Sequence, residues 1–383
     1  ILLQIMLIGR VKWIETIFGF DKLSRLHHVN GFIIPFLIVI HPMLLVISSS
    51  LVSKRDWITS FIRLLNIDNV FNALLGTILF LILVVLAILI VYKKLKYEAW
   101  YLTHLAMYAA VLLAFSHEFS GDDMSGWAVA FWYGLYAFVL INLLYYRFFL
   151  PIWRSWKHEF KVDRVAEEPG EVTSIYITGK NLDKYKVKAG QFFIFRFLDK
   201  ERWWQAHPFS LSVAPNGKFL RISAKALGDF TAKMHGIKPG TRIFIDGPHG
   251  VFTLDRANKD KYLLVAGGIG ITPVRSIAET LAMDKKDAVL LYGSRTERGI
   301  TFRNEFQEMS NGALNVQYVL SNDAAWQGEK GYIDKEKIQR LAPDFMDREV
   351  YLCGPKPMMR GALSAFKQLG VPRHQIHFEL FSL

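Results

Sequence analysis

Four long apolar segments occupy the first 150 positions of the chain, at residues 29–50, 72–92, 99–117 and 127–150. Each approaches the roughly 20 residues that a helix needs to cross a hydrocarbon layer about 30 Å thick. The pattern therefore predicts four membrane-spanning helices. The apolar run at residues 1–8 is too short to span, and because the sequence opens inside it without a methionine, we interpret it as the end of an earlier, truncated helix.

The hydrophobic pattern changes near residue 158, where short runs separated by turns replace the long apolar segments. Residues 190–198 and 218–227 read as strands, and a turn at residues 214–217 precedes the second of them. This spacing predicts a small antiparallel β-barrel over residues 158–255.

The last third of the chain alternates buried strands with helical segments. Residues 261–282 read as a buried strand, a glycine turn and a helix, and further apolar runs predict strands at residues 288–295, 314–321 and 348–355. Strands that alternate with helices predict a parallel sheet, here in an α/β domain over residues 258–383. The predicted fold class is a multidomain membrane protein that combines an α-helical transmembrane bundle, the antiparallel β-barrel and this parallel-sheet domain.

Composition and charge narrow the class of protein. Hydrophobic residues make up 52% of the 383 positions, and 46 Lys and Arg outnumber 34 Asp and Glu, for a net charge of +12. A nucleic-acid-binding protein would gather basic residues into a patch beside polar base-reading side chains. Here they flank the apolar spans, which indicates a lipid bilayer and not nucleic acid as the partner. The one cysteine, Cys353, excludes an intrachain disulfide.

Basic residues also predict the orientation of the membrane domain, residues 1–150. They cluster before the first full span, between the second and third, and after the fourth: Arg10, Lys12, Lys22, Arg25, Lys93, Lys94, Lys96, Arg147, Arg154, Lys157, Lys161 and Arg164. Because cytoplasmic loops carry the excess of Lys and Arg, these connections and both C-terminal domains are predicted to be cytoplasmic, in a multi-pass protein of the plasma membrane. The connections at residues 51–71 and 118–126 then face outward.

Histidines interrupt two of the predicted spans. His27 and His41 belong to the first full span, and His104 and His117 to the third. Ionisable residues inside a membrane are costly and point to a functional site. The two spans run parallel, so their histidines form two levels, about 20 Å apart along the helices. Two haems fit this arrangement, with one imidazole from each helix on each iron: His27 with His104, and His41 with His117.

Other readings of these histidines stay open. They could be packing residues bonded to backbone or water. A zinc ion is less suitable for them than haem, because the two levels lie too far apart to build one tetrahedral site. The 14-residue step from His27 to His41 returns to within about 40° of one helix face, but the 13-residue step from His104 to His117 misses it by about 140°. Either the third span is locally over- or under-wound, or the ligands approach from different sides. The same angle favours His27 over His28.

Four short motifs follow one another in the C-terminal half: HPFSLS at 207–212, GDFT at 228–231, AGGIGITP at 266–273 and LCGPKPMM at 352–359. Each motif alone is common, but their order resembles the ferredoxin-reductase-like flavoproteins. With the membrane histidines added, the chain is similar to the NADPH oxidase and ferric reductase transmembrane family, and within it to prokaryotic oxidases of the streptococcal kind.

This resemblance implies an FAD site on the barrel. One group of residues would shape the flavin cleft, with Ser210 bonded to the flavin edge that receives hydride. A second group would lie near the pyrophosphate, with Arg221 as a candidate charge partner. In chain order the residues are His207, Pro208, Phe209, Ser210, Arg221, Gly228, Phe230 and Thr231. The alternative is a proline-containing strand start and a glycine turn, which any barrel can have.

The resemblance also implies an NAD(P)H site at the parallel sheet. Glycines would let the backbone approach the dinucleotide phosphate, and the following helix would present its N-terminal amides to it. Pro273 replaces the last glycine of the Rossmann fingerprint. Cys353 would lie near the nicotinamide, or else be a small buried hydrophobe. The residues are Gly267, Gly268, Gly270, Thr272, Pro273, Cys353, Gly354 and Pro355.

Two further features concern the nucleotide and the flavin. Arg295 and Arg298 could hold the 2′-phosphate of NADPH or be solvated loop residues, so the choice between NADPH and NADH stays open. By resemblance, Phe381 would stack on the flavin and move aside for the nicotinamide, and the alternative is a core residue. The expected catalytic residues are then Ser210, Cys353 and Phe381.

The expected activity is that of an NAD(P)H oxidase. Electrons would pass from cytoplasmic NAD(P)H through FAD and two b-type haems to external dioxygen, which becomes superoxide, with no obligatory protein partner. The alternatives are a ferric or cupric chelate reductase, and an electron donor to a quinone or a periplasmic partner protein. A histidine-lined proton channel fused to a reductase-like regulator would bind no haem.

Overall fold

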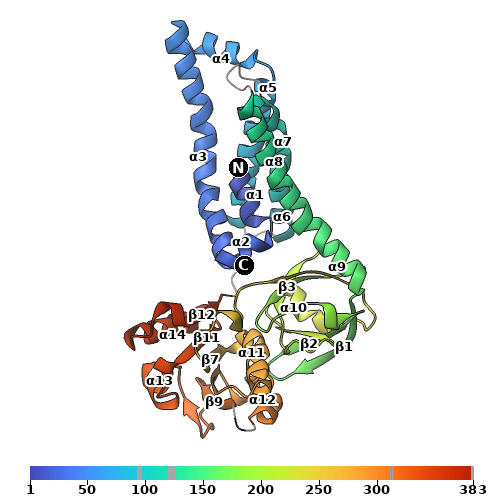
Figure 1. Ribbon diagram of the computed structural model, residues 1–383, viewed down its shortest axis with the longest axis vertical. Coiled ribbons are helices and arrows are strands. Elements are labelled where there is room, and N and C mark those ends of the chain that lie inside the picture. Colours follow the sequence, from blue (N-terminus) through green and yellow to red (C-terminus); the bar gives the residue numbers. More distant parts are fainter. Residues whose placement is uncertain (93–96, 120–125, 311, 313, 381–383) are drawn as a thin grey trace. The chain divides into compact units, whose positions relative to one another are not determined.

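The chain forms two compact units. The first consists of Ile1–Ile14 and Lys22–Phe148, and the second of Glu15–Asp21 and Phe149–Leu383. A short segment near the N-terminus therefore belongs to the same unit as the C-terminal half. The structure is a computed structural model (Figure 1) that describes residues 1–92, 97–119, 126–310, 312 and 314–380.

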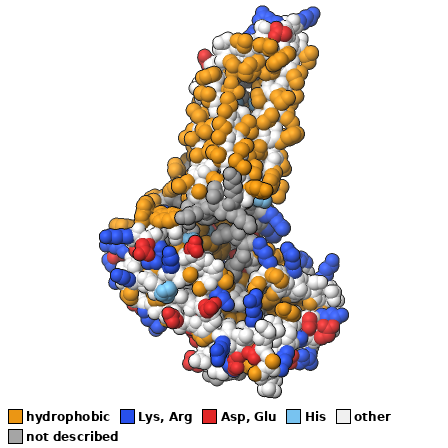
Figure 2. Space-filling model, turned by 180° about the vertical axis from the view of Figure 1, so that it is seen from behind, with side chains coloured by type: hydrophobic (Ala, Val, Ile, Leu, Met, Phe, Trp, Pro, Cys, Tyr) orange, Lys and Arg blue, Asp and Glu red, His pale blue; other side chains and the backbone are white. Residues whose placement is uncertain are grey.

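Helices build the first unit, although the end of α2 and the start of α3 belong to the second. Their bounds are α1 (Leu2–Ile8), α2 (Lys12–Phe18), α3 (Phe20–Ser53), α4 (Trp57–Leu65), α5 (Val70–Tyr92), α6 (Tyr97–Leu105), α7 (Met107–Phe115) and α8 (Trp127–Leu143). Hydrophobic side chains cover their surface in Figure 2. The four predicted spans are confirmed, because four described segments are long and apolar enough to cross a membrane: Phe20–Ser53, Val70–Tyr92, Ala99–Phe119 and Trp127–His158.

The third span is not one continuous helix. α6 ends at Leu105, α7 begins at Met107, and a 3₁₀ turn occupies Ser116–Phe119. A 3₁₀ turn advances the chain by about 120° per residue, compared with about 100° in an α-helix. The structure therefore shows a local change of winding in this span, which is one of the two alternatives that the 13-residue spacing left open.

Packing inside the first unit differs from helix to helix. α5 and α7 approach closely, because a Cβ at Gly76 would lie only 2.8 Å from the carbonyl oxygen of Ala110 and 3.1 Å from the amide nitrogen of Ala114. α3 lies beside them as a separate column (Figure 1), and no residue in its described apolar window is buried. The histidine rings of α3 contact the third span, His27 at His104 of α6 and His41 at His117 in the 3₁₀ turn.

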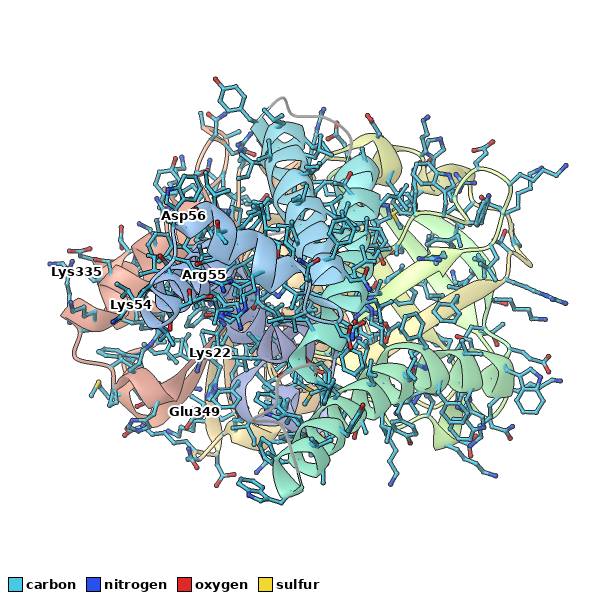
Figure 3. The ribbon with its side chains drawn as sticks, turned by 90° about the horizontal axis from the view of Figure 1, so that it is seen from above. Lys22, Lys54, Arg55, Asp56, Lys335 and Glu349 are labelled. Atoms are coloured by element: carbon cyan, nitrogen blue, oxygen red, sulfur yellow. The ribbon has the colours of Figure 1, made fainter. Side chains whose placement is uncertain are left out.

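A short helix, α4, lies in the connection at residues 51–71, which the sequence predicted only as an outward loop. Asp56 starts this helix, and its Oδ1 accepts a hydrogen bond from the backbone N–H of Thr59 at 2.9 Å. Lys54, Arg55 and Asp56 come together at this end (Figure 3).

Several residues used to predict orientation lie outside the described residues: Lys93, Lys94, Lys96 and residues 120–125.

A barrel begins the larger part of the second unit. Its elements are α9 (Leu150–His158), β1 (Lys161–Glu168), β2 (Val172–Thr178), β3 (Phe192–Phe197), β4 (His207–Ser210), β5 (Leu220–Lys225), α10 (Asp229–Ala232) and β6 (Ile243–His249). The strands form two antiparallel sheets, in the orders β1-β2-β5 and β4-β3-β6. Isolated bridges, Lys161 with Arg242 and Leu211 with Ile222, join the two sheets. The predicted antiparallel barrel is confirmed.

A parallel sheet forms the rest of this unit. Its elements are β7 (Lys261–Gly267), α11 (Ile271–Met283), β8 (Ala288–Ser294), α12 (Arg303–Met309), β9 (Leu314–Leu320), β10 (Glu329–Lys330), α13 (Lys335–Leu341), β11 (Arg348–Cys353), α14 (Lys356–Gln368) and β12 (Ile376–Glu379). The strand order is β10-β9-β8-β7-β11-β12, which confirms the predicted α/β domain. The order reverses between β7 and β11, and ligands of such sheets bind at this switch point.

Candidate functional site

The four membrane histidines meet in two pairs. The ring centroids of His27 on α3 and His104 on α6 lie 5.9 Å apart, and those of His41 on α3 and His117 in the 3₁₀ turn lie 6.4 Å apart. These are the two pairs that the sequence indicated. The two histidines of α3 are 14 residues apart in sequence, and their partners in the third span are 13 residues apart.

The separation within each pair fits an iron atom. With metal–nitrogen bonds about 2 Å long and ring nitrogens about 1 Å from the ring centre, an iron between two imidazoles sets the ring centroids roughly 6 Å apart. Both measured separations lie close to this value. Because no described residue in the apolar window of α3 is buried, its apolar side chains are available to a flat macrocycle at each level.

Hydrogen bonding also suits the imidazoles to metal binding. Nδ1 of His117 donates to the carbonyl oxygen of Ala114, which leaves Nε2 as the ring nitrogen that could bind a metal. Nδ1 of His27 is buried and has no hydrogen-bond partner among the described residues. The described chain holds no group of three or more His, Cys, Asp or Glu that could bind a metal. A protein-only site such as structural zinc is therefore not built there, whereas a haem needs only two axial side chains.

The structure separates the two adjacent histidines of α3. His27 faces His104, but His28 is exposed and makes an edge-to-face contact with Phe32 of its own helix, with centroids 5.1 Å apart. On the other side, Trp100 stacks on the ring of His104 at 5.0 Å and 18°. The geometry thus favours His27 over His28 as the partner of His104.

The two motifs expected at the flavin lie side by side on the barrel. His207 on β4 stacks on Phe230 of α10, with ring centroids 3.8 Å apart. Oγ1 of Thr231 accepts a hydrogen bond from the backbone N–H of Gly228 at 3.1 Å, which shapes the turn before α10. Ser210 is buried, and its hydroxyl has no hydrogen-bond partner among the described residues. This buried hydroxyl at the end of β4 fits a hydrogen bond to a flavin.

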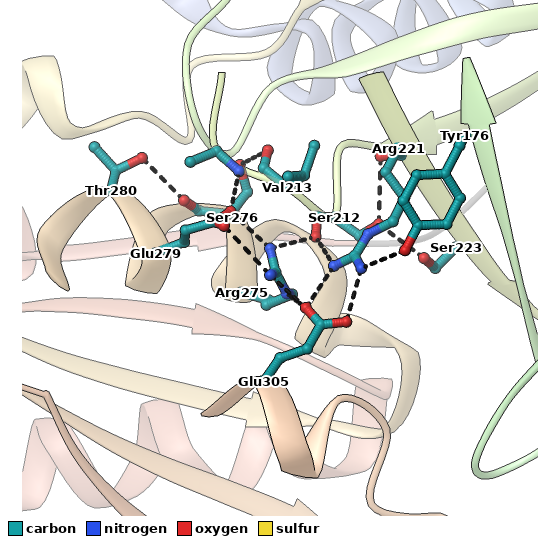
Figure 4. A network of polar contacts seen from close by, with 11 residues as sticks. Tyr176, Ser212, Val213, Arg221, Ser223, Arg275, Ser276, Glu279, Thr280 and Glu305 are labelled. Carbon is teal, nitrogen blue, oxygen red and sulfur yellow. Dashed lines mark hydrogen bonds and ion pairs between the residues drawn. The ribbon is translucent and has the colours of Figure 1, made fainter. Parts of the chain in front are cut away.

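Arg221 has a different environment from the one expected. Its guanidinium bonds both carboxylate oxygens of Glu305 at 2.7 and 3.0 Å (Figure 4), and it also donates to the hydroxyl of Tyr176. Arg275 of α11 bonds the same carboxylate. Arg221 therefore joins the barrel to α12 of the parallel-sheet domain, which favours a structural role over the expected contact with pyrophosphate.

The nucleotide motifs meet at the switch point of the parallel sheet. Cys353 at the end of β11 pairs in register with Ala266 on β7. The glycine turn follows β7 directly, and Gly268 has a left-handed φ of +51°. A Cβ at Gly270 would lie 2.5 Å from the carbonyl oxygen of Cys353 and 2.6 Å from Cα of Gly354. Only glycine lets the two loops approach this closely.

The remaining nucleotide residues shape the starts of two helices. Oγ1 of Thr272 donates to the carbonyl oxygen of Ile269 at 3.0 Å, and Pro273 lies in the first turn of α11, where a missing N–H costs no helical hydrogen bond. Pro355 is the residue before α14. Both helices therefore begin at the carboxyl ends of β7 and β11, where a dinucleotide would bind.

Cys353 has a buried neighbour that the sequence did not single out. Glu379 on β12 is its register partner, and both side chains are buried. Burial, followed by the charge of Glu379, raises the pKa of the Cys353 thiol well above its usual value. Burial likewise raises the pKa of the Glu379 carboxyl. The one signal in the sequence is an acidic residue inside the apolar end HFELFSL. Phe381 lies outside the described residues.

Arg295 and Arg298 follow β8 and are both exposed. The backbone N–H of Glu297, between them, donates to a carboxylate oxygen of Asp323 at 2.9 Å. Acidic and basic groups thus share this edge of the sheet. The assignment of Arg295 to the 2′-phosphate of NADPH stays a prediction.

Gly270→Ala tests the contact between the two nucleotide loops. The new Cβ would press on the backbone of Cys353 and Gly354, so one loop has to move and the Kd for NAD(P)H is expected to rise at least about tenfold, a loss of about 1.4 kcal/mol. The matched control is Gly361→Ala on α14, where a Cβ meets nothing within 4 Å. Nucleotide titration of the purified chain measures both variants. Equal affinities would contradict the assignment.

Comparison with known families agrees with this geometry. Residues 1–115 match the family described as "Ferric reductase like transmembrane component". Residues 158–253 match an FAD-binding domain, and residues 264–363 match an oxidoreductase NAD-binding domain.

Similar proteins extend the comparison. A flavohemoprotein of Candida albicans is 30% identical over 267 residues, which cover 66% of each chain. A flavohemoprotein of Oceanobacillus iheyensis is 29% identical over 238 residues, 58% of each chain. A glycine betaine monooxygenase reductase subunit of Pseudomonas aeruginosa is 26% identical over 239 residues, 60% of this chain and 65% of that one. The chain thus spans about three fifths of the length of these curated relatives.

Solved structures show the same fold in the reductase part. The ferredoxin reductase in carbazole 1,9a-dioxygenase aligns with a TM-score of 0.52 at 26% identity, over 59% of this chain and 69% of that one. The flavohem-like FAD/NAD-binding domain of nitric oxide dioxygenase from Vibrio cholerae aligns with a TM-score of 0.52 at 24% identity, over 59% and 99%. With a ferric reductase-like transmembrane component, an FAD-binding domain and an NAD-binding domain in this order, the chain belongs to the NADPH oxidase and ferric reductase-like family of transmembrane oxidoreductases.

Proposed function

We propose that this protein is an NAD(P)H oxidase that carries electrons across the plasma membrane to dioxygen and produces superoxide. The observation that carries the proposal is the two imidazole pairs, His27 with His104 and His41 with His117, each spaced for one b-type haem. When bound, FAD accepts a hydride and releases electrons singly, and the haems carry single electrons. The distribution of basic residues supports a cytoplasmic FAD and NAD(P)H unit.

The residues of the chain have separate tasks in this proposal. The stacked pair of His207 and Phe230 and the hydroxyl of Ser210 hold the flavin on the barrel. Gly270 and Cys353 bring the nucleotide loops together at the switch point, which sets the nicotinamide beside the flavin cleft. No obligatory protein partner is part of the proposal.

Dioxygen is the acceptor that the outer histidine pair supports best. Two imidazoles on one iron would leave no open coordination position, so an acceptor would have to take the electron without binding the metal. Glu118, next to His117, accepts a hydrogen bond from the hydroxyl of Tyr136. The carboxylate of Glu118 therefore binds a side chain of α8. The resemblance to streptococcal-type oxidases also supports dioxygen.

A ferric or cupric chelate reductase is the second candidate. The match of residues 1–115 to a ferric reductase-like component favours it. Such an enzyme would use the same flavin and histidine pairs and differ only at the outer face. Transfer to a quinone or a periplasmic protein is a third outcome that the same experiment detects.

The test uses the purified full chain in detergent, loaded with FAD and haem. We expect a reduced-minus-oxidised spectrum of b-type haem, two haems and one FAD per chain, and NAD(P)H-driven cytochrome c reduction that superoxide dismutase abolishes. Turnover only with ferric or cupric chelates, insensitive to the dismutase, would favour the chelate reductase over the oxidase. Turnover only with a quinone or an added protein would replace the oxidase. A colourless protein that binds no haem would overturn the proposal and favour a channel.

A further inference from the structure

The segment Glu15–Asp21 is built into the second unit, although both of its neighbours in sequence belong to the first. Oε1 of Glu15 accepts a hydrogen bond from the backbone N–H of Gly250 at 2.6 Å. Arg256 donates to the carbonyl oxygen of Thr16 at 2.6 Å, and the ring of Phe20 lies against that of Phe192, with centroids 5.7 Å apart. These contacts place a carboxylate from the N-terminal region beside the end of β6.

Glu15 and two residues of β6 form a buried array of titratable groups. Nδ1 of His249 lies 3.2 Å from Oε2 of Glu15, and Nε2 of His249 lies 3.2 Å from Oδ1 of Asp246. The three residues are only 1 to 4% exposed. Buried charges are costly unless they are paired. A carboxylate–imidazole–carboxylate array meets this condition and can also take up a proton at one end and release one at the other.

The array lies between β4, which carries Ser210, and β12, which carries Glu379. In the sheet β4-β3-β6, Phe192 pairs in register with Ser210 on one side and with His249 on the other. Neighbouring strands lie about 4.8 Å apart, so the backbones of Ser210 and His249 are about 10 Å apart on one row of the sheet. On the opposite side, a Cβ at Gly250 would lie 4.0 Å from Oε2 of Glu379.

Most of the titratable groups described around the array are acidic, and two arginines lie beside them. Glu15 comes from α2, Asp246 from β6 and Glu379 from β12, and Asp21 at the start of α3 and the thiol of Cys353 on β11 face the same region. Arg154 on α9 and the hydroxyl of Tyr185 both donate to the carbonyl oxygen of Gly247, next to Asp246. The guanidinium of Arg256 contacts the backbone of residues 16 and 17. Burial, then the charges of Asp21 and Glu15, raises the pKa of Glu379, so this carboxyl favours a bound proton.

Electron export creates a need for such a group. Each NAD(P)H gives up a hydride, which is two electrons and one proton. Under the proposed function, on which this inference rests, only electrons reach the acceptor. One proton per NAD(P)H therefore stays behind in a buried cleft and has to return to water.

We propose that Glu15, His249 and Asp246 form the relay that removes this proton from the flavin cleft. The proton enters at the carboxylate of Glu15, on the side of Glu379, and passes to Nδ1 of His249. The N–H at Nε2 then gives its proton to Oδ1 of Asp246. Only O–H and N–H bonds form and break in this transfer, and no electrons move. The imidazole returns to its starting tautomer when, after Asp246 has released its proton, the proton on Nδ1 moves to Nε2.

His249→Gln tests the relay, because glutamine keeps a polar side chain but cannot carry a proton at neutral pH. The full chain, loaded with FAD, oxidises NAD(P)H with ferricyanide, an acceptor that takes electrons only and needs neither haem nor dioxygen. We expect turnover to fall roughly a hundredfold or more, as is typical for the loss of a proton-transfer group, and the ratio of rates in H₂O and D₂O to rise. The matched control is His377→Gln, which removes the imidazole paired with Glu349 at 2.7 Å in the same unit.

A readout without turnover accompanies this assay. The midpoint potential of the bound FAD is titrated against pH in the wild type, His249→Gln and Glu15→Gln. A relay beside the flavin predicts that both substitutions alter the pH dependence of the potential, whereas His377→Gln leaves it unchanged. Glu15→Gln also keeps the test open if His249→Gln does not fold.

The outcomes separate the relay from the proposed function. A wild type that reduces ferricyanide with NAD(P)H, together with wild-type isotope ratios and potentials in both relay variants, would overturn the relay alone. A wild type that fails to oxidise NAD(P)H with ferricyanide would overturn the proposed function. Equal effects of His377→Gln and His249→Gln would show a general loss of structure and would also count against the relay.

Discussion

Replacing His117 with leucine is expected to lower the haem content from two to one per chain and to abolish electron transfer to the external acceptor. The ring of His117 faces that of His41 at 6.4 Å, and Ala114 fixes its orientation. Leucine leaves a single imidazole at this level, which cannot provide two axial ligands. The inner pair, His27 with His104, lies one level away and keeps its own haem.

His104→Leu and His28→Leu complete this test. His104→Leu is expected to remove the other haem and leave the outer one in place. His28 is the matched control, because it neighbours His27 on α3 but contacts Phe32 of its own helix edge to face. The haem content per chain and the reduced-minus-oxidised spectrum measure all three variants. Unchanged haem content in His117→Leu, or a loss in His28→Leu, would contradict the assigned pairs.

The levels of these histidines could be predicted from the sequence, but the rotation of their helices could not. A helix rises by a nearly constant step per residue, so spacings of 14 and 13 residues already set two matched levels. The interruption at Ala106 and the 3₁₀ turn at Ser116–Phe119 depend on packing around the span. A count of residues along a regular helix therefore predicted the wrong face for His117.

In the C-terminal half, too, some features could be predicted from the sequence and others could not. The rule that parallel strands gather their carboxyl ends at one edge predicted that the AGGIGITP and LCGP loops would meet, and the register of β7 with β11 shows that they do. The partners of Arg221 and His249 could not be predicted. Glu305 lies 84 residues from Arg221, and Glu15 lies 234 residues from His249. No periodic pattern links such positions, so only the folded chain reveals these ion pairs.

Glu305→Leu is expected to destabilise the second unit strongly. Arg221 and Arg275 are buried, at 3% and 4% exposure, and both bond the carboxylate of Glu305 (Figure 4). Leucine would leave two buried guanidinium groups without this charge, which costs about 3 kcal/mol when one partner of a buried pair is lost. For a unit of this size, thermal unfolding of the full chain should shift down by roughly 6–12 °C.

The effect of Glu305→Leu should depend on pH with a defined sign. Burial acts to raise the pKa of Glu305, but the hydrogen bonds and charges of Arg221 and Arg275 outweigh it and hold this pKa below its usual value of 4.5. A lowered pKa in the folded state stabilises the protein above the unfolded value, and this contribution is lost as the pH falls through the folded value. The difference in Tm from the wild type should therefore be constant near neutral pH and shrink below about pH 4.5.

Flavin fluorescence during heating reports this unfolding across the pH series. The matched control is Glu336→Leu on α13, where an exposed carboxylate lies 3.6 Å from Lys335 and its loss should change stability by less than about 0.5 kcal/mol. Equal Tm values for the two variants would show that the network of Arg221, Arg275 and Glu305 does not stabilise the unit. A difference that grew as the pH fell would contradict an ionised Glu305. Because this network joins the barrel to α11 and α12, its loss should also weaken the alignment of flavin and nicotinamide before the unit unfolds.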